Sequence, residues 1–88
     1  MKVYYRKKFL KQLSKLPHDI RAKIEQFAFD ELPKINSIQE SGKIEKMSGY
    51  KNYYKIRFGS YRVGIKSEDN SLILQIVMHR REIYKYFP

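Results

Sequence analysis

Alternating apolar and polar residues dominate the second half of the chain and predict three β-strands, because successive side chains of a strand point to opposite faces. Two of these strands, residues 53–58 and 61–66, are separated by the turn Gly59-Ser60, and the third covers residues 72–79. The connections predict an antiparallel meander. One face would carry the apolar residues Tyr54, Ile56, Phe58, Tyr61, Val63, Ile65, Leu72, Leu74, Ile76 and Met78. The other would carry Tyr53, Lys55, Arg57, Arg62, Gly64, Lys66, Ile73, Gln75, Val77 and His79.

Apolar residues recur at helical spacing in the first half of the chain. A short strand is expected at residues 3–5, and an amphipathic helix follows it up to about residue 16. Pro17 suits the first turn of a second helix, which runs to about Leu32, where Pro33 forbids continuation. The apolar stripes are Phe9, Leu10, Leu13 and Leu16 in the first helix and Ile20, Ile24, Phe27 and Ala28 in the second. Because almost no loop separates the helices, we expect an antiparallel hairpin.

The remaining segments are loops and a terminal tail. Residues 34–52 are rich in Ser, Asn and Gly, with a possible short edge strand at residues 43–47. Residues 80–87 are expected to form a brief helix or a draped tail, with Phe87 packing on the core. The fold that buries every apolar stripe is α+β with two layers. In it, the N-terminal helical hairpin packs on one face of an antiparallel sheet of about four strands, followed by a short C-terminal helix or tail. We expect one domain, residues 1–88, with no room for a second core.

The chain is strongly basic, with 19 Lys and Arg residues against nine Asp and Glu residues and a formal net charge of +10. Such an imbalance attracts polyanions, so nucleic acid is the first partner to consider; the alternative is a basic surface that serves solubility. The predicted sheet favours the former, because it gathers Lys55, Arg57 and Arg62 on one face. Like charges on neighbouring strands repel, and a second layer over them would be costly without carboxylates to pair them. We therefore expect this face to remain open to solvent and to meet an anion.

Several kinds of site lack the residues they need. The chain has no Cys, which excludes thiolate chemistry and Cys-based zinc sites. His18 and His79 lie in unrelated elements and the nine acidic residues are scattered, so neither a metal site nor a catalytic carboxylate pair is expected. No Gly-rich phosphate loop is present, and no cofactor is expected. The first residues are charged and lead into no long apolar run, which predicts no signal peptide, no membrane span and a cytoplasmic location.

The remaining cationic and aromatic residues suit RNA cleavage without a metal. In that reaction the 2′-OH of the substrate attacks the adjacent phosphate, so the enzyme supplies a proton acceptor, a proton donor and cations for the charged transition state. Arginine holds phosphate oxygens through its planar fork, and tyrosine orients or stacks on a base. The candidates are Lys55, Arg57, Arg62, His79, Arg80, Arg81, Tyr84 and Tyr86. Simpler interpretations remain open: Lys55 and Arg57 as ordinary strand residues facing solvent, and His79 as a hydrogen-bonded group at a strand end.

Motifs spread over nearly the whole chain resemble the RelE/ParE superfamily of toxins from bacterial toxin–antitoxin pairs. They are Lys-Met-Ser-Gly at 46–49, Tyr-Lys-Ile-Arg-Phe at 54–58, Gly-Ser-Tyr-Arg-Val at 59–63 and His-Arg-Arg-Glu-Ile-Tyr at 79–84. The superfamily holds two activities: one branch cleaves mRNA in the ribosomal A site, and the ParE-like branch poisons DNA gyrase. Five positions match the RelE branch: Lys55 and Arg57 its basic pair, Arg62 its phosphate-stabilising arginine, Arg80 the arginine after the last strand, and Tyr84 the C-terminal tyrosine.

The resemblance implies a ribosome-dependent mRNA endoribonuclease that acts as a growth-inhibiting toxin. In this hypothesis Lys55 or His79 is the base, and the sequence leaves the choice between them open. Arg57 and Arg62 clamp the transition state, Arg80 is a proton donor or charge partner, and Tyr84 orients the scissile nucleotide. Further contacts to RNA are expected from Tyr53, Lys66, Arg81 and Tyr86.

The same resemblance implies protein partners. A cognate antitoxin would cover the basic face or displace the terminal helix, and the ribosome would present the mRNA. We expect a monomer when the protein is alone, a hetero-oligomer with the antitoxin, and no membrane partner. The alternative function is that of a ParE-like, gyrase-directed toxin that uses this fold as a binding surface and cuts no RNA.

Overall fold

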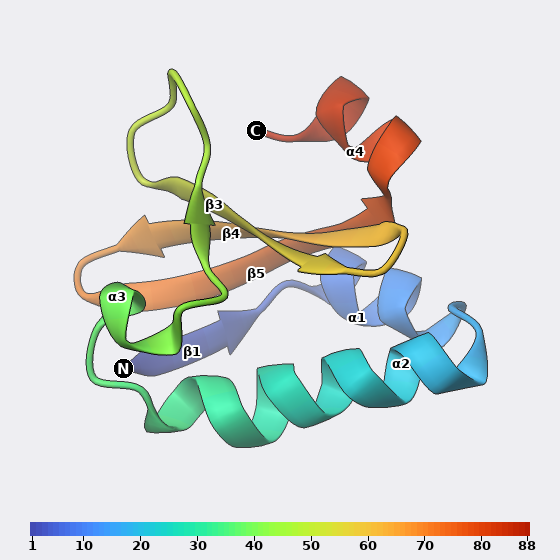
Figure 1. Ribbon diagram of the computed structural model, residues 1–88, viewed down its shortest axis with the longest axis horizontal. Helices are drawn as coiled ribbons and strands as arrows, with labels where there is room; N and C mark the ends of the chain where they lie inside the picture. Colours follow the sequence, from blue (N-terminus) through green and yellow to red (C-terminus); the bar gives the residue numbers. More distant parts are fainter.

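A five-stranded sheet forms the middle of the computed structural model, which describes all 88 residues, 1–88 (Figure 1). The strands are β1 (Lys2–Tyr5), β2 (Glu45–Lys46), β3 (Tyr53–Phe58), β4 (Tyr61–Glu68) and β5 (Ser71–His79), in the order β1-β5-β4-β3-β2. The predicted meander β3-β4-β5 is confirmed as antiparallel. Gly59 opens its first turn with φ of +56°, a conformation that glycine adopts without strain. The expected α+β class is confirmed, but the sheet is mixed, because β1 pairs with β5 in parallel.

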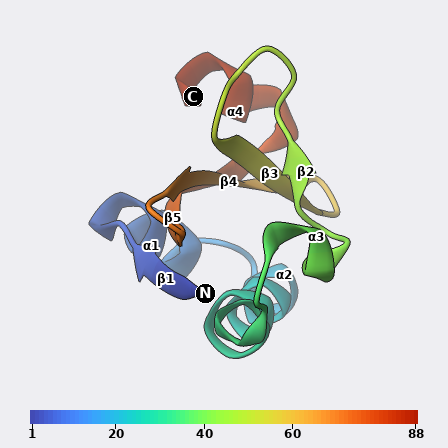
Figure 2. The ribbon, with the colours of Figure 1, turned by 90° about the vertical axis from the view of Figure 1, so that its left-hand side faces the viewer.

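Helices lie on both sides of this sheet (Figure 2). The predicted hairpin is confirmed as α1 (Lys7–Ser14) and α2 (His18–Glu25), with Pro17 directly before α2. The second helix continues as a π-helical stretch, η1 (Gln26–Glu31), and ends in the 3₁₀ turn η2 (Leu32–Lys34), which contains Pro33. A single helical turn, α3 (Ile38–Ser41), precedes the short edge strand β2. The C-terminal segment is a helix, α4 (Arg80–Tyr86), on the side of the sheet opposite α1 and α2.

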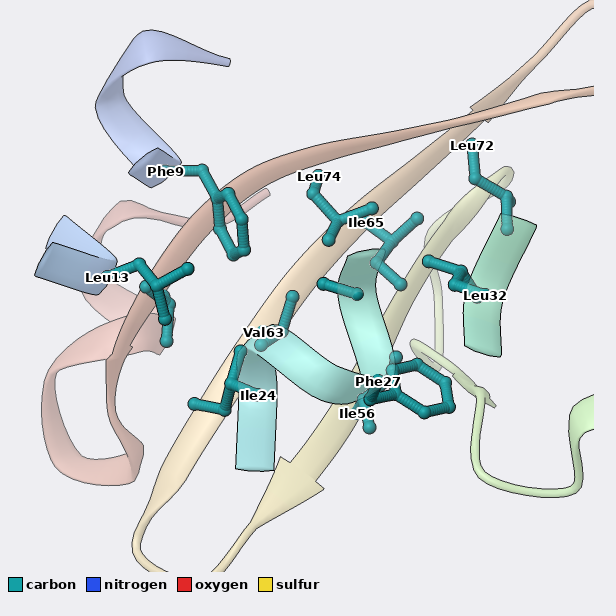
Figure 3. Close-up of a cluster of buried hydrophobic side chains, with 12 residues drawn as sticks. Phe9, Leu13, Ile24, Phe27, Leu32, Ile56, Val63, Ile65, Leu72 and Leu74 are labelled. Atoms are coloured by element: carbon teal, nitrogen blue, oxygen red, sulfur yellow. The ribbon is translucent and has the colours of Figure 1, made fainter. Parts of the chain in front are cut away.

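The main core fills the space between the sheet and α1, α2 and η1 (Figure 3). Phe9 and Leu13 of α1 and Ile24 of α2 are almost fully buried there, as the helical spacing predicted. The complete cluster is Phe9, Leu13, Ile24, Phe27, Ala28, Leu32, Ile56, Val63, Ile65, Leu72, Leu74 and Val77. Burying a side chain of this size is worth about 1.5–3 kcal/mol, so this layer supplies most of the hydrophobic stabilisation.

An irregularity in β5 changes which residues face this core. Ile65 pairs with Leu74 but Gly64 pairs with Ile76, so Gln75 is an extra residue on β5. Such a β-bulge reverses the alternation beyond it. Residues 72 and 74 therefore face the helical hairpin as predicted, whereas the predictions that Ile76 and Met78 point inward and Val77 outward are wrong.

The second face carries a smaller apolar cluster under α4. Met47, Ile76, Ile83 and Phe87 are buried together there, with Tyr53 and Met78 packed against them. Phe87 thus packs the tail onto the protein, as expected, but on the face that we expected to be open. That face is partly covered because the bulge brings Ile76 onto it and Gly64 has no side chain to fill the space beside Ile76. None of the helices is both long enough and apolar enough to cross a bilayer.

Candidate nucleic-acid interface

Strands β3 and β4 bring three of the predicted cations onto the face that also carries α4. Lys55 lies opposite Gly64 and Arg57 lies opposite Arg62 in the antiparallel register. Lys55 and Arg57 are two residues apart on one strand, so their side chains leave the sheet on the same side. Arginines directly opposite each other repel. The hydrogen bonds and ion pairs that these cations form within the chain therefore have to offset that repulsion.

Lys55 is linked to the C-terminal helix. Its Nζ donates a hydrogen bond of 2.9 Å to the hydroxyl of Tyr84 and lies 5.3 Å from the centre of that ring. Lys55 is half-buried, while the Tyr84 side chain is 55% exposed. The base candidate and the candidate for orienting the nucleotide are thus in direct contact, which their distance in sequence did not predict.

Arg57 has a carboxylate partner that the sequence analysis missed. Its Nε donates to Oε2 of Glu45 on β2 at 3.1 Å; the Arg57 side chain is largely exposed and that of Glu45 is partly exposed. Glu45 pairs with Lys55 in the register of β2 and β3, so this carboxylate lies beside two of the three cations. The sequence predicted a possible strand at residues 43–47, which contains Glu45. It did not predict how that strand pairs with residues 53–58, and the pairing is what brings Glu45 to Arg57. Because only Nε is engaged, the outer nitrogens of Arg57 stay free for an anion.

Arg62 is held by the β3–β4 turn. Its Nη1 donates to the carbonyl oxygens of Gly59, at 2.8 Å, and Tyr61, at 2.9 Å. The same turn meets the start of α4, where the backbone N–H of Arg80 donates to the carbonyl of Ser60 at 2.8 Å. The Arg80 side chain is exposed and has no partner within the chain. Arg62 and Arg80 are therefore anchored to one turn with guanidinium nitrogens available to solvent.

His79 is placed apart from these cations. It lies opposite Tyr61, and the two rings meet edge to face at 5.7 Å. Tyr61 alternates with Arg62 along β4, so the prediction that His79 points to the cationic face is wrong; the bulge at Gln75 reverses it. Its Nδ1 accepts from the backbone N–H of Arg81 at 3.2 Å and caps α4. The simpler interpretation, a hydrogen-bonded group at a strand end, describes this arrangement.

The other predicted contact residues surround this face. Tyr53 packs edge to face on Phe87 at 5.5 Å, and Nζ of Lys66 lies 5.9 Å from the Tyr53 ring. Lys66 also forms an exposed ion pair of 3.7 Å with Glu68. Arg81 and Tyr86 are exposed on α4, and Tyr86 reaches 59% exposure. Tyr53 is therefore partly committed to packing, whereas Arg81 and Tyr86 are free to contact a ligand.

The cationic residues form a surface and not a cleft. Two hollows, of about 280 and 330 Å³, lie beyond Arg57, between η1 and the segment around Lys43. Arg57 lines the first of them, but Lys55, Arg62 and Tyr84 line neither. No three His, Cys, Asp or Glu side chains lie close enough together to hold a metal ion. An extended polyanion with protruding phosphates fits such a surface better than a small molecule would.

Comparison with known proteins shows the family to which the chain belongs. The sequence model described as ParE toxin of type II toxin–antitoxin system, parDE, matches residues 3–84. The chain is 42% identical over 89 residues to Toxin RelE3 of Methanocaldococcus jannaschii, and the match covers 100% of both proteins.

Solved structures give the same result for the fold. A chain of the RelB-RelE antitoxin-toxin complex from Methanococcus jannaschii superimposes with a TM-score of 0.78 at 38% identity, covering 97% of this chain and 99% of that one. A chain of the intact E. coli RelBE toxin-antitoxin complex gives a TM-score of 0.66 at 21% identity over 89% of this chain and 94% of that one, and it supports the fold alone. The protein belongs to the RelE/ParE superfamily of type II toxin–antitoxin toxins.

Proposed function

We propose that this protein is the toxin of a toxin–antitoxin pair and that it cleaves mRNA on the ribosome. The observation that carries the proposal is the arrangement of Lys55, Arg57 and Arg62 on one sheet face, with Tyr84 hydrogen-bonded to Lys55. Membership of the superfamily and 42% identity to a protein named Toxin RelE3 support the toxin role. The matching positions support the nuclease branch over a purely binding role.

The proposed reaction uses groups of the protein and the RNA together with solvent water. The 2′-oxygen attacks the adjacent phosphorus while its proton passes to the base. A new P–O2′ bond forms, the P–O5′ bond breaks, and the 5′-oxygen leaves with a proton from water. The products are a 2′,3′-cyclic phosphate and a 5′-hydroxyl.

Lys55 is the better of the two candidates for the base. It lies on the same sheet face as Arg57 and Arg62, and in its neutral form the amine has a lone pair to accept the 2′-OH proton. His79 lies on the other face of the sheet, the one that carries Tyr61, and its Nδ1 accepts a hydrogen bond from the backbone N–H of Arg81. For His79 to reach the same phosphate, the start of α4 would have to rearrange. We therefore assign the base to Lys55.

The arginines hold the phosphate in this proposal. Arg57 and Arg62 lie opposite each other on β3 and β4, and in the proposal their free guanidinium nitrogens hold one phosphate group and stabilise the extra charge of the transition state. Arg80 is a charge partner of the departing 5′-oxygen and not its proton donor, because a guanidinium keeps its proton in proteins. Tyr84 presents an exposed ring on which a nucleotide base can stack, next to Arg81 and Tyr86 as outer contacts.

The proposed partner that restrains the toxin is an antitoxin. A net charge of +10 on 88 residues disfavours the compact state and attracts an acidic segment. The similar solved structure from Methanococcus jannaschii, at 38% identity, is described as a RelB-RelE antitoxin-toxin complex, which supports an antitoxin for this chain too. Its binding is expected to raise the thermal midpoint of the toxin, since a ligand of the folded state alone stabilises that state.

One experiment tests the nuclease proposal against the gyrase alternative. Purified protein is added to ribosomes programmed with a defined mRNA, and separately to gyrase with relaxed plasmid. We expect mRNA cut at discrete positions on ribosomes and unaffected supercoiling. A single 2′-deoxy nucleotide at the cut position should abolish cutting there, because the nucleophile is gone. Intact mRNA together with inhibited gyrase would overturn the proposal in favour of the ParE-like activity, which the match to the ParE toxin family keeps as second candidate.

A further inference from the structure

The space above Gly64 is a slot filled by the ring of Phe87, which follows α4 near the end of the chain. A Cβ atom placed on Gly64 would lie 2.8 Å from both Cδ2 and Cε2 of Phe87 and 2.7 Å from Cγ2 of Ile76. Carbon atoms in packed proteins approach to about 3.5–4.0 Å, so no other residue fits there without displacing the ring. Gly64 has no positive φ that would explain the glycine by backbone conformation. Its missing side chain matters because it admits Phe87.

Phe87 is held in this slot from several sides. It is 4% exposed, it packs with Met47, Ile76 and Ile83, and it meets Tyr53 edge to face at 5.5 Å. Its backbone N–H donates to the carbonyl of Ile83 at 2.8 Å, which ties the residue to the last turn of α4. The aromatic ring therefore fixes the end of α4 on the sheet, while Arg80 and the cap of His79 fix its start.

The strand position of Gly64 links this slot to the proposed chemistry. Gly64 is the register partner of Lys55, and Lys55 is the residue whose Nζ donates to Tyr84. Tyr84 is exposed on α4, three residues before Phe87, so little besides the docking of the helix holds its ring over Lys55. We propose that Gly64 and Phe87 form a latch that positions α4 so that Tyr84 meets Lys55. Both are positioning residues, and the inference rests on the proposed function.

A set of single and double variants tests the latch. Phe87→Ala empties the slot, Gly64→Ala displaces the ring, and Phe87→Leu keeps the slot filled. In single-turnover cleavage of ribosome-bound mRNA we expect Phe87→Ala to be about 10- to 100-fold slower, since a misplacement of ~1 Å can cost on the order of 10²-fold. Gly64→Ala should also be slow, and Phe87→Leu should recover most of the rate. Phe29→Ala, at an exposed phenylalanine on the hairpin side, is the matched control and should cut at the wild-type rate.

A double-mutant comparison separates positioning from general destabilisation. If the latch acts through Tyr84, adding Phe87→Ala to a Tyr84→Ala protein should change the rate by less than about twofold, because the two effects are coupled. A loss of stability alone would slow both backgrounds equally, and that result would overturn the proposal. Should Phe87→Ala fail to fold, Gly64→Ala in the two backgrounds decides the question in the same way.

A measurement without activity keeps this proposal distinct from the nuclease proposal. In proton NMR the ε-methylene of Lys55 should show nuclear Overhauser effects to the Tyr84 ring in the wild type, Phe87→Leu and Phe29→Ala. These signals should vanish in Phe87→Ala and weaken in Gly64→Ala. Persistence of the signals in Phe87→Ala would refute the latch even if the wild type cuts mRNA. Their loss, combined with uncut mRNA in the wild type, would support the latch and refute the nuclease proposal.

Discussion

The two faces of the sheet are covered in different ways. The face toward α1, α2 and η1 is sealed by a cluster of 12 buried hydrophobic residues and carries none of the clustered cations. The face toward α4 buries only four residues, and Lys55, Arg57 and Arg62 lie beside that small cluster. No polar or charged residue is fully buried in the protein. The comparison indicates that one face supplies stability, while the other gives up part of its apolar contact to hold charges close together.

The largest expected effect is a loss of stability when the core on the sealed face, toward α1, α2 and η1, is disrupted. Phe9→Ala removes a fully buried ring from the main core and should lower the free energy of unfolding by about 3–5 kcal/mol. That is a large part of the roughly 5–15 kcal/mol available to a small domain. The midpoint of urea unfolding followed by circular dichroism measures the loss. Arg57→Ala, on the other face and exposed, should shift the same free energy by no more than about 0.5 kcal/mol. Equal losses in the two variants would contradict the division of roles.

A slightly smaller effect is expected on the cleavage rate when a cation is removed from the charged face, the one that carries Lys55, Arg57 and Arg62. Arg62→Ala removes one of the two opposed guanidinium groups and should slow cleavage of ribosome-bound mRNA about 10²–10³-fold, as does loss of a single transition-state donor elsewhere. Gel-resolved time courses with excess protein measure the rate. Arg62→Lys keeps the charge but loses the planar fork, so recovery should be partial. Full activity in Arg62→Ala would remove this residue from the site.

The ion pair at the edge of the charged face should show a modest effect. Glu45→Gln keeps the size of the side chain but frees Arg57 from its carboxylate. Exposed ion pairs contribute about 0.2–1 kcal/mol, so the affinity for a short single-stranded RNA should rise by up to about fivefold. Fluorescence anisotropy at low salt measures it, and the gain should shrink as salt screens the charges. A weaker affinity would instead mean that Glu45 holds Arg57 in its binding orientation.

The smallest effect tests a polar contact at the rim of the sealed face. The Tyr5 hydroxyl donates to the carbonyl of Ala28, and burial, helped by the nearby Asp30 carboxylate, raises the pKa of Tyr5 above 10. A raised pKa means that this stabilisation is fully present below about pH 10 and is lost as the pH rises through the folded-state value. Tyr5→Phe should cost about 1 kcal/mol at pH 7, and its stability should fall less between pH 9 and 11. Parallel stability curves for the two proteins in that range would contradict the assignment.

Sequence periodicity predicted the sealed face better than the charged one. Helical and alternating patterns are local, so the hairpin and the inward residues Ile56, Val63 and Leu74 followed from spacing alone. The extra residue Gln75 leaves no sign in the hydrophobic pattern, because Ile76, Val77 and Met78 are all apolar. The orientation of His79 depended on that single residue.

Contacts between distant segments account for the other differences. The carboxylate of Glu45 reaches Arg57 through a two-residue strand whose register no turn specifies. The docking of α4 depends on an absent side chain at Gly64, and the parallel pairing of β1 depends on the whole sheet. The residue types of the candidate site could thus be chosen from the sequence, whereas their partners required the structure.

The central claim is that the face carrying Arg57 and Arg62 performs the cleavage. Primer extension on ribosome-bound mRNA tests it most directly, with the wild type, Arg57→Ala/Arg62→Ala, and Lys8→Ala/Lys11→Ala. The last variant removes the same charge from exposed positions of α1, on the other side of the sheet. We predict discrete stops with the wild type and with the α1 variant, and full-length product with the double arginine variant. Stops of equal intensity in all three would contradict the account.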